Sequence, residues 1–164
     1  MTAESYGKIS KPFCKNGKAV KAINTINRIL TLVVYASYPS LLSYVFLFVR
    51  EKSVKTVLVP AIMLVAVSVL RKIINRKRPY VALNIEPIIK KDKHGESMPS
   101  RHIFSVFMIA MAFMYVEPLW SVPLFVTGVI LGVIRIIGGV HYPSDIFVGA
   151  LIGIVSGIIG FFVI

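Results

Sequence analysis

The sequence predicts an all-α membrane protein, built as a multi-pass helix bundle of about five transmembrane helices. Two observations carry this prediction. Hydrophobic residues fill 56% of the 164 positions, compared with roughly 45–50% in an ordinary soluble domain. These residues gather in uncharged runs whose lengths approach the roughly 20 residues that cross a bilayer as a helix. The length of the chain corresponds to a single domain, because domains average about 150 residues.

The charge and cysteine content exclude several other classes of protein. Only 16% of the residues are charged, yet the formal net charge is +12. Disordered chains have low hydrophobicity, and the lone Cys14 supports neither a disulfide scaffold nor a thiolate zinc site. A soluble nucleic-acid binder would explain the charge but not the apolar excess, and the aromatic residues lie in apolar runs rather than among the bases. We therefore expect no nucleic-acid partner, and a membrane protein that keeps its charge in loops.

Each predicted span follows from one uncharged run. The first run covers 29–49, and the second covers 56–70 and lengthens if Arg71 and Lys72 reach back to the membrane edge. The third and fourth runs are short, so their spans include polar ends. The five expected spans are residues 27–49, 54–74, 100–116, 119–137 and 144–164.

The residues before the first span form a basic segment. We expect residues 1–26 to be an amphipathic interfacial segment that binds anionic lipid headgroups, followed by one transmembrane domain over 27–164. A signal peptide is not expected, because this segment lacks an apolar core of 7–15 residues. Its lysines are Lys8, Lys11, Lys15, Lys18 and Lys21.

Glycines recur on one side of the last expected span, at Gly149, Gly153, Gly157 and Gly160. Such spacing permits close approach of a second helix. The favoured use is packing within the chain, and the alternative is a homodimer face.

The remaining polar residues concentrate on one side of the membrane. In a bundle of five alternating spans, the end of the second, the start of the third, the end of the fourth and the start of the fifth share one face. Basic residues at several heights there suit a phosphate ester, since guanidinium groups bind phosphate oxygens in pairs. Ser100 and His102 open the third span, where free backbone N–H groups favour an anion.

A histidine and an acid open the fifth span. His141 and Asp145 are four residues apart, so a helical turn brings them together. A carboxylate on one imidazole nitrogen makes the other a better nucleophile, and His102 is then free to protonate a leaving oxygen. Because no acidic cluster is available for magnesium, we expect no metal and no cofactor.

Three motifs resemble those of the type 2 phosphatidic acid phosphatase superfamily. They are Arg78-Pro79, then Pro99-Ser100-x-His102, then Arg135-x5-His141-x3-Asp145, beside the family signatures K-x6-R-P, P-S-G-H and S-R-x5-H-x3-D. The resemblance covers residues 71–145 and the pattern of spans. It implies an integral membrane phosphatase that acts without metal on a lipid phosphate such as phosphatidate, phosphatidylglycerophosphate or undecaprenyl diphosphate.

The resemblance also implies a role for each matching residue. His141 becomes the nucleophile that forms a phosphohistidine, Asp145 orients it, and His102 is the general acid. The expected phosphate-binding residues are Arg71, Lys72, Arg78, Ser100, Arg101 and Arg135.

The chain departs from the family pattern at three positions. Arg71 stands in place of the first-signature lysine, with Lys72 one place late. Arg101 replaces the second-signature glycine, which would cause strain if that backbone angle required glycine. Ile134 replaces a serine. These departures leave one alternative open: a non-catalytic protein or small transporter that binds anionic lipid through Arg78 and Arg135 and needs neither histidine.

The distribution of bases also bears on orientation in the cell membrane. Most lysines and arginines fall on the side of the expected site, whereas Arg50, Lys52 and Lys55 fall on the other side. The excess of bases favours a cytoplasmic site, whereas analogy with bacterial family members favours an extracytoplasmic one.

Overall fold

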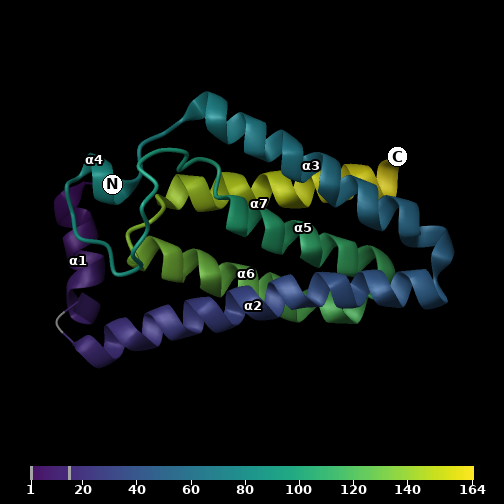
Figure 1. Cartoon of the computed structure of the whole chain (residues 1–164), viewed down its shortest axis with the longest axis horizontal. Helices are drawn as coiled ribbons and strands as arrows, with labels where there is room; N and C mark the ends of the chain where they lie inside the picture. Colours follow the sequence, from purple (N-terminus) through teal and green to yellow (C-terminus); the bar gives the residue numbers. More distant parts are fainter. Residues whose placement is uncertain (1, 15) are drawn as a thin grey trace.

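The computed structural model describes residues 2–14 and 16–164, and over these residues the regular structure is helical, without strands. Lys15, one of the expected headgroup-binding lysines, lies outside the described residues. Figure 1 shows the long helices of the chain side by side, with the helix α1 (Ala3–Cys14) lying across one end of them. The helices are α1 (Ala3–Cys14), α2 (Gly17–Phe48), η1 (Arg50–Lys52), α3 (Ser53–Ile74), α4 (Pro79–Ala82), α5 (Arg101–Val116), α6 (Pro118–Ile137), α7 (Pro143–Ile158) and the π-helical turn η2 (Ile159–Val163).

The predicted membrane bundle is confirmed. Among the described residues, four helical stretches are long and apolar enough to cross a membrane: Gly17–Phe48, Arg50–Ala82, Pro118–Ile137 and Pro143–Val163. The fifth, α5, is shorter, with 16 residues. The chain is therefore a multi-pass membrane protein.

The first long helix begins before its expected boundary at residue 27. It starts at Gly17, where the Asn16 side chain accepts a hydrogen bond from the Lys18 amide at 2.9 Å and so satisfies one of the free N–H groups of the first turn. The expected interfacial segment thus consists of α1 and the first turns of α2. Lysine is a good helix former, so the uncharged run marks where the helix enters the bilayer rather than where it begins.

Helix α5 lies at the centre of the bundle. Ten of its residues are buried, and it packs most extensively on α6 and α7. One side, with Phe104 and Met108, packs against apolar residues of α2, α3 and η2. The other side, with Ile103 and Phe107, packs against α2 and α6. The apolar side chains that remain exposed lie on the outer helices, as expected for surfaces that contact lipid.

The glycine stripe of α7 is used within the chain. A Cβ at Gly149 would lie 2.7 Å from the Ser100 carbonyl oxygen, and a Cβ at Gly153 would lie 2.9 Å from the Phe104 carbonyl oxygen. The stripe therefore lets α7 approach α5 closely, which agrees with the favoured interpretation. The homodimer stays a prediction.

The helix ends meet as the alternating topology requires. At one end of the bundle, the Tyr44 hydroxyl donates to Glu117 Oε1 at 2.8 Å and Lys52 Nζ donates to the Tyr115 carbonyl at 2.9 Å. The opposite end gathers the C-termini of α3 and α6, the N-termini of α5 and α7, and the crossing helix α1 (Figure 1). The motif residues therefore share that second end.

Candidate active site

The turn between α6 and α7 presents His141 beside Asp145. Tyr142 is the residue before the helix and Pro143 its first residue, a position where proline suits the helical backbone. Asp145 Oδ2 accepts a hydrogen bond from the Tyr142 amide at 2.9 Å, which fixes the carboxylate at the start of α7. His141 Nδ1 then lies 3.5 Å from the same oxygen, with both side chains almost fully buried.

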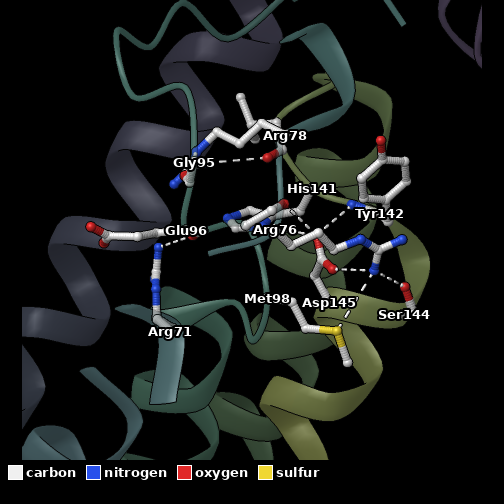
Figure 2. A network of polar contacts seen from close by, with 12 residues as sticks. Arg71, Arg76, Arg78, Gly95, Glu96, Met98, His141, Tyr142, Ser144 and Asp145 are labelled. Atoms are coloured by element: carbon white, nitrogen blue, oxygen red, sulfur yellow. Dashed lines mark hydrogen bonds and ion pairs between the residues drawn. The ribbon is translucent and has the colours of Figure 1, made fainter. Parts of the chain in front are cut away.

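Asp145 is held by further donors that the motifs did not indicate. Arg76 Nη1 lies 2.9 Å from Asp145 Oδ1, and the Ser97 hydroxyl donates to Oδ2 at 2.5 Å. Arg76 also donates to the Ser144 hydroxyl at 2.8 Å and stacks over the Tyr142 ring, 4.1 Å from its centroid. Figure 2 shows Arg76 reaching Asp145 and Ser144 from beside the ring. The carboxylate is therefore immobilised in an ionised form.

The buried position of His141 determines its protonation. Burial lowers the pKa of His141 to about 4; the nearby Asp145 opposes this effect, and the positive charges of Arg78 and Arg135 add to it. The imidazole is therefore neutral near pH 7. With Nδ1 facing Asp145, Nε2 is the nitrogen that is free to act as a nucleophile.

Two arginines donate hydrogen bonds to the loops around the His141–Asp145 pair. Arg78 Nε donates to the Gly95 carbonyl at 3.1 Å and Arg78 Nη1 to the Val140 carbonyl at 3.2 Å. Arg71, at the end of α3, donates to the Glu96 carbonyl, as Figure 2 also shows. The loop before α5 and the loop before α7 are thus tied to the same cluster of guanidinium groups.

Several buried donors in this cluster have no protein acceptor. The donors that lack a hydrogen-bond partner among the described residues are Arg71 Nε, the Ser100 hydroxyl, and both Nε and Nη1 of Arg135. Arg135 is only 2% exposed. A buried polar group without a partner is costly, and a buried charge more so. The cluster is therefore suited to an anion with several oxygen acceptors, such as a phosphate group.

A cavity of about 410 Å³ opens next to these donors. Arg71, Arg78, Arg101 and His102 line its helical side, and the residues 90–93 line its loop side. His102 stacks on Tyr35, with ring centroids 6.1 Å apart. The charges of Arg135, Lys91 and Arg101 all act on the His102 imidazole, which places the second histidine at the same cluster.

The structure brings together all the predicted site residues except Lys72. That side chain is exposed and does not line the cavity. It lines a neighbouring surface hollow together with Arg101 and residues of α3. Lys72 follows Arg71 directly, and a helix turns successive side chains by about 100°, so only one of the two faces the cavity. Arg101 is the first residue of α5 and is not among the described residues with positive φ. Its replacement of glycine therefore causes no backbone strain.

Three residues of the site were missed by the sequence interpretation. Arg76 and Ser97 hold Asp145, and Lys91 lines the cavity. Arg76 was visible only as part of a basic cluster next to a membrane span. Ser97 and Lys91 lie in a polar loop without periodicity, so no local spacing signals their contacts.

Comparison with known proteins agrees with the motifs and the fold. The family model described as "PAP2 superfamily" matches residues 52–163. The undecaprenyl-diphosphatase BcrC of Bacillus subtilis (strain 168) is 27% identical over 143 residues, covering 85% of this chain and 74% of BcrC.

Two solved structures share the architecture. The crystal structure of Aquifex aeolicus LpxE superposes with a TM-score of 0.74 at 30% identity, covering 97% of this chain and 93% of that chain. A PAP2-type phosphatidylglycerolphosphate phosphatase from Bacillus subtilis superposes with a TM-score of 0.71 at 19% identity, covering 96% and 83%. At 19% identity, the similarity to the second structure supports a shared fold and nothing more.

Proposed function

Because this chain belongs to the PAP2 superfamily of membrane lipid phosphatases, we propose that it hydrolyses a phosphomonoester or diphosphate of a membrane lipid through a phosphohistidine on His141. The candidate substrates are phosphatidate, phosphatidylglycerophosphate and undecaprenyl diphosphate. The observation that carries the proposal is the set of buried donors without acceptors at Arg71, Ser100 and Arg135, beside a buried His–Asp pair.

In the proposed reaction, His141 Nε2 attacks the phosphorus atom and the bond from phosphorus to the leaving oxygen breaks. The electron pair goes to that oxygen, which takes a proton from His102. The unpaired donors of Arg71, Ser100 and Arg135 bind the terminal phosphate oxygens and stabilise their charge. A bound phosphate dianion favours the protonated form of His102.

The second half of the reaction restores the enzyme. A water molecule gives a proton to His102 and attacks the phosphohistidine. The P–N bond breaks, inorganic phosphate leaves, and His141 returns to its neutral form. Guanidinium groups supply the positive charge throughout, and the described residues contain no group of three or more His, Cys, Asp or Glu side chains suited to a metal ion. We therefore propose that the reaction needs no metal.

The test is phosphate release by the purified full-length protein in detergent micelles, from the three candidate lipids, with and without EDTA. Release that persists in EDTA and disappears in His141→Ala is the expected result. His94→Ala is the matched control, because His94 is an exposed histidine in the loop before α5. Full activity of His141→Ala would overturn the mechanism, and lipid binding without turnover by the wild-type protein would favour the non-catalytic alternative.

We further propose that the protein lies in the cell membrane with its site on the cytoplasmic side, as the excess of bases at that end favours. The test uses a Cys14→Ser background, since Cys14 is the one exposed cysteine. Glu86→Cys reports on the site end and Glu51→Cys on the opposite end, and both glutamates are exposed. Labelling of position 51 but not 86 by an impermeant thiol reagent in intact cells is expected, and the reverse pattern would contradict this orientation.

We also propose that α1 binds anionic headgroups. It lies across the site end of the bundle (Figure 1), and Lys8 and Lys11 on it are exposed. Replacing both by glutamine should weaken the stimulation of the enzyme by anionic lipid in mixed micelles.

A further inference from the structure

The cavity beside the catalytic residues has a second basic side that the reaction above does not use. Arg71 and His102 lie on the helical side, whereas Lys91 lies on the loop side. The loop there reads Lys90-Lys91-Asp92-Lys93. This side of the cavity carries positive charge beyond the buried donors that would hold a single phosphate group.

Lys91 differs from its neighbours in the loop in burial and in pairing. Lys90 and Lys93 are exposed, whereas Lys91 is half-buried. Lys93 is occupied by an ion pair with Glu96 at 3.0 Å. Among the ion pairs of the described residues, none includes Lys91. Lys91 therefore offers an unpaired ammonium group to the cavity.

The groups that face Lys91 are themselves basic. Burial lowers the pKa of Lys91 to about 8, and nearby positive charges add to this effect. These charges belong to Arg135 from α6, Arg78 before α4, Arg71 from α3 and Arg101 from α5. A cation held among cations is unfavourable in the absence of an anion. An additional anionic group in the cavity would offset this repulsion.

Resting on the proposed phosphatase function, we propose that Lys91 and Arg101 form a second phosphate subsite, which binds the inner phosphate of a lipid diphosphate. His102 and Arg101 are adjacent in sequence and line the same cavity as Lys91. Because His102 protonates the leaving oxygen, the leaving group lies in this cavity, within the lining that Lys91 and Arg101 share. When the substrate is instead the monophosphate of the same uncharged tail, the leaving group is a neutral alcohol, which carries no charge for Lys91 to bind.

His141 Nε2 attacks the outer phosphorus, and the bond from that phosphorus to the bridging oxygen breaks. The electron pair stays on the bridging oxygen, which takes the proton of His102, so the first product is the lipid monophosphate, whose remaining negative charge Lys91 and Arg101 stabilise. Water then hydrolyses the phosphohistidine and releases inorganic phosphate. The subsite thus makes the chain selective for a lipid diphosphate over the monophosphate with the same tail.

The test compares farnesyl diphosphate with farnesyl phosphate, which share one tail and differ by one phosphate group. The measured quantity is the ratio of kcat/KM for the two substrates, with the full-length protein in detergent micelles. Lys91→Ala should lower this ratio roughly 10- to 100-fold, the range expected for the loss of one charged hydrogen bond. Lys91→Arg should retain most of it.

Lys77→Ala is the matched control, since Lys77 is exposed and its loss changes the net charge by the same amount. An equal loss of activity on both substrates in Lys91→Ala, or a wild-type enzyme that hydrolyses only the monophosphate, would overturn the second subsite and leave the phosphatase function standing. If the wild-type enzyme releases phosphate from neither farnesyl substrate nor from any candidate lipid, the proposed function itself fails, and the subsite with it.

Discussion

Arg76 pairs with Asp145 at 2.9 Å, on the carboxylate oxygen opposite the one that faces His141. Asp145 therefore sits between a permanent cation and the imidazole. It faces His141 Nδ1 at 3.5 Å while Arg76 stabilises its negative charge, so it remains ionised at the buried start of α7. In the proposed mechanism, Arg76 is thus a positioning residue that acts through Asp145 on His141.

Replacing Arg76 should affect the rate more than substrate binding. In Arg76→Met we expect kcat to fall roughly 10- to 100-fold with a small change in KM, because the Asp145 carboxylate loses a charge-assisted hydrogen bond of about 1.5–3 kcal/mol that fixes its position. Arg76→Lys should restore part of kcat. Steady-state kinetics on one lipid phosphate measure both parameters, and a change confined to KM would show that Arg76 binds substrate instead.

The acid limit of activity should lie well below the ordinary pKa of histidine. In the proposed mechanism the neutral form of His141 is the nucleophile, and burial lowers the pKa of His141 to about 4. Activity should therefore persist as the pH falls through 6.5 and be lost as it approaches 4. The measurement is the pH dependence of kcat/KM, which reports on the free enzyme, corrected for ionisation of the substrate. A loss centred near pH 6.5 would argue against a buried, neutral His141.

The alkaline limit should depend on Lys91 when the substrate is a diphosphate. The charged form of Lys91 exists below its pKa of about 8, so kcat/KM for farnesyl diphosphate should decline as the pH rises through that value. Lys91→Arg should remove this decline, because arginine stays protonated. Farnesyl phosphate provides the comparison, and a decline of equal size for both substrates would point to a group other than Lys91.

Arg135 should support activity at the expense of stability. It is buried with two donor atoms that lack partners among the described residues. In Arg135→Met we expect kcat/KM to fall at least 100-fold while the Tm rises, because an apolar side chain of similar length removes an unpaired buried charge. Thermal unfolding in detergent, with and without phosphate, measures the second effect. A lower Tm without ligand would mean that the guanidinium stabilises the free protein.

The close contact between α5 and α7 should be sensitive to a single methyl group. A Cβ at Gly149 would lie 2.7 Å from the Ser100 carbonyl oxygen, so Gly149→Ala should separate the two helix starts and lower both Tm and kcat. Gly7→Ala is the control, because its Cβ would meet only the flexible end of Lys11 at 3.7 Å. Equal Tm values for the two variants would contradict this account of the packing.

The fold could be predicted from the sequence because membrane spans depend on local composition. Uncharged runs located every long helix, and the alternation of spans placed the motif residues at one end. The start of α2 at Gly17 was missed, because the boundary of a hydrophobic run reports entry into the bilayer and not helix initiation.

The site was predictable where its geometry is local and not where it depends on loop conformation. His141 and Asp145 are one helical turn apart, so their spacing indicates their contact. The ion pair of Arg76 with Asp145 joins residues 69 positions apart, so it depends on the end of α3 lying beside the start of α7. Lys91 lies in a loop that Arg71 and Arg78 hold by hydrogen bonds to its backbone carbonyl groups. Such contacts leave no periodic pattern in the sequence.

The short length of α5 influences how deep the proposed site lies in the bilayer. At 1.5 Å per residue, its 16 residues span about 24 Å, less than the roughly 30 Å of a bilayer's hydrocarbon core. The longer helices around it therefore extend beyond at least one of its ends. Because α5 contacts mainly other helices, its position follows the protein interior rather than the thickness of the surrounding lipid. Bilayers of different thickness should thus change how far the outer helices tilt before they change the depth of Ser100 and His102 at the proposed phosphate site.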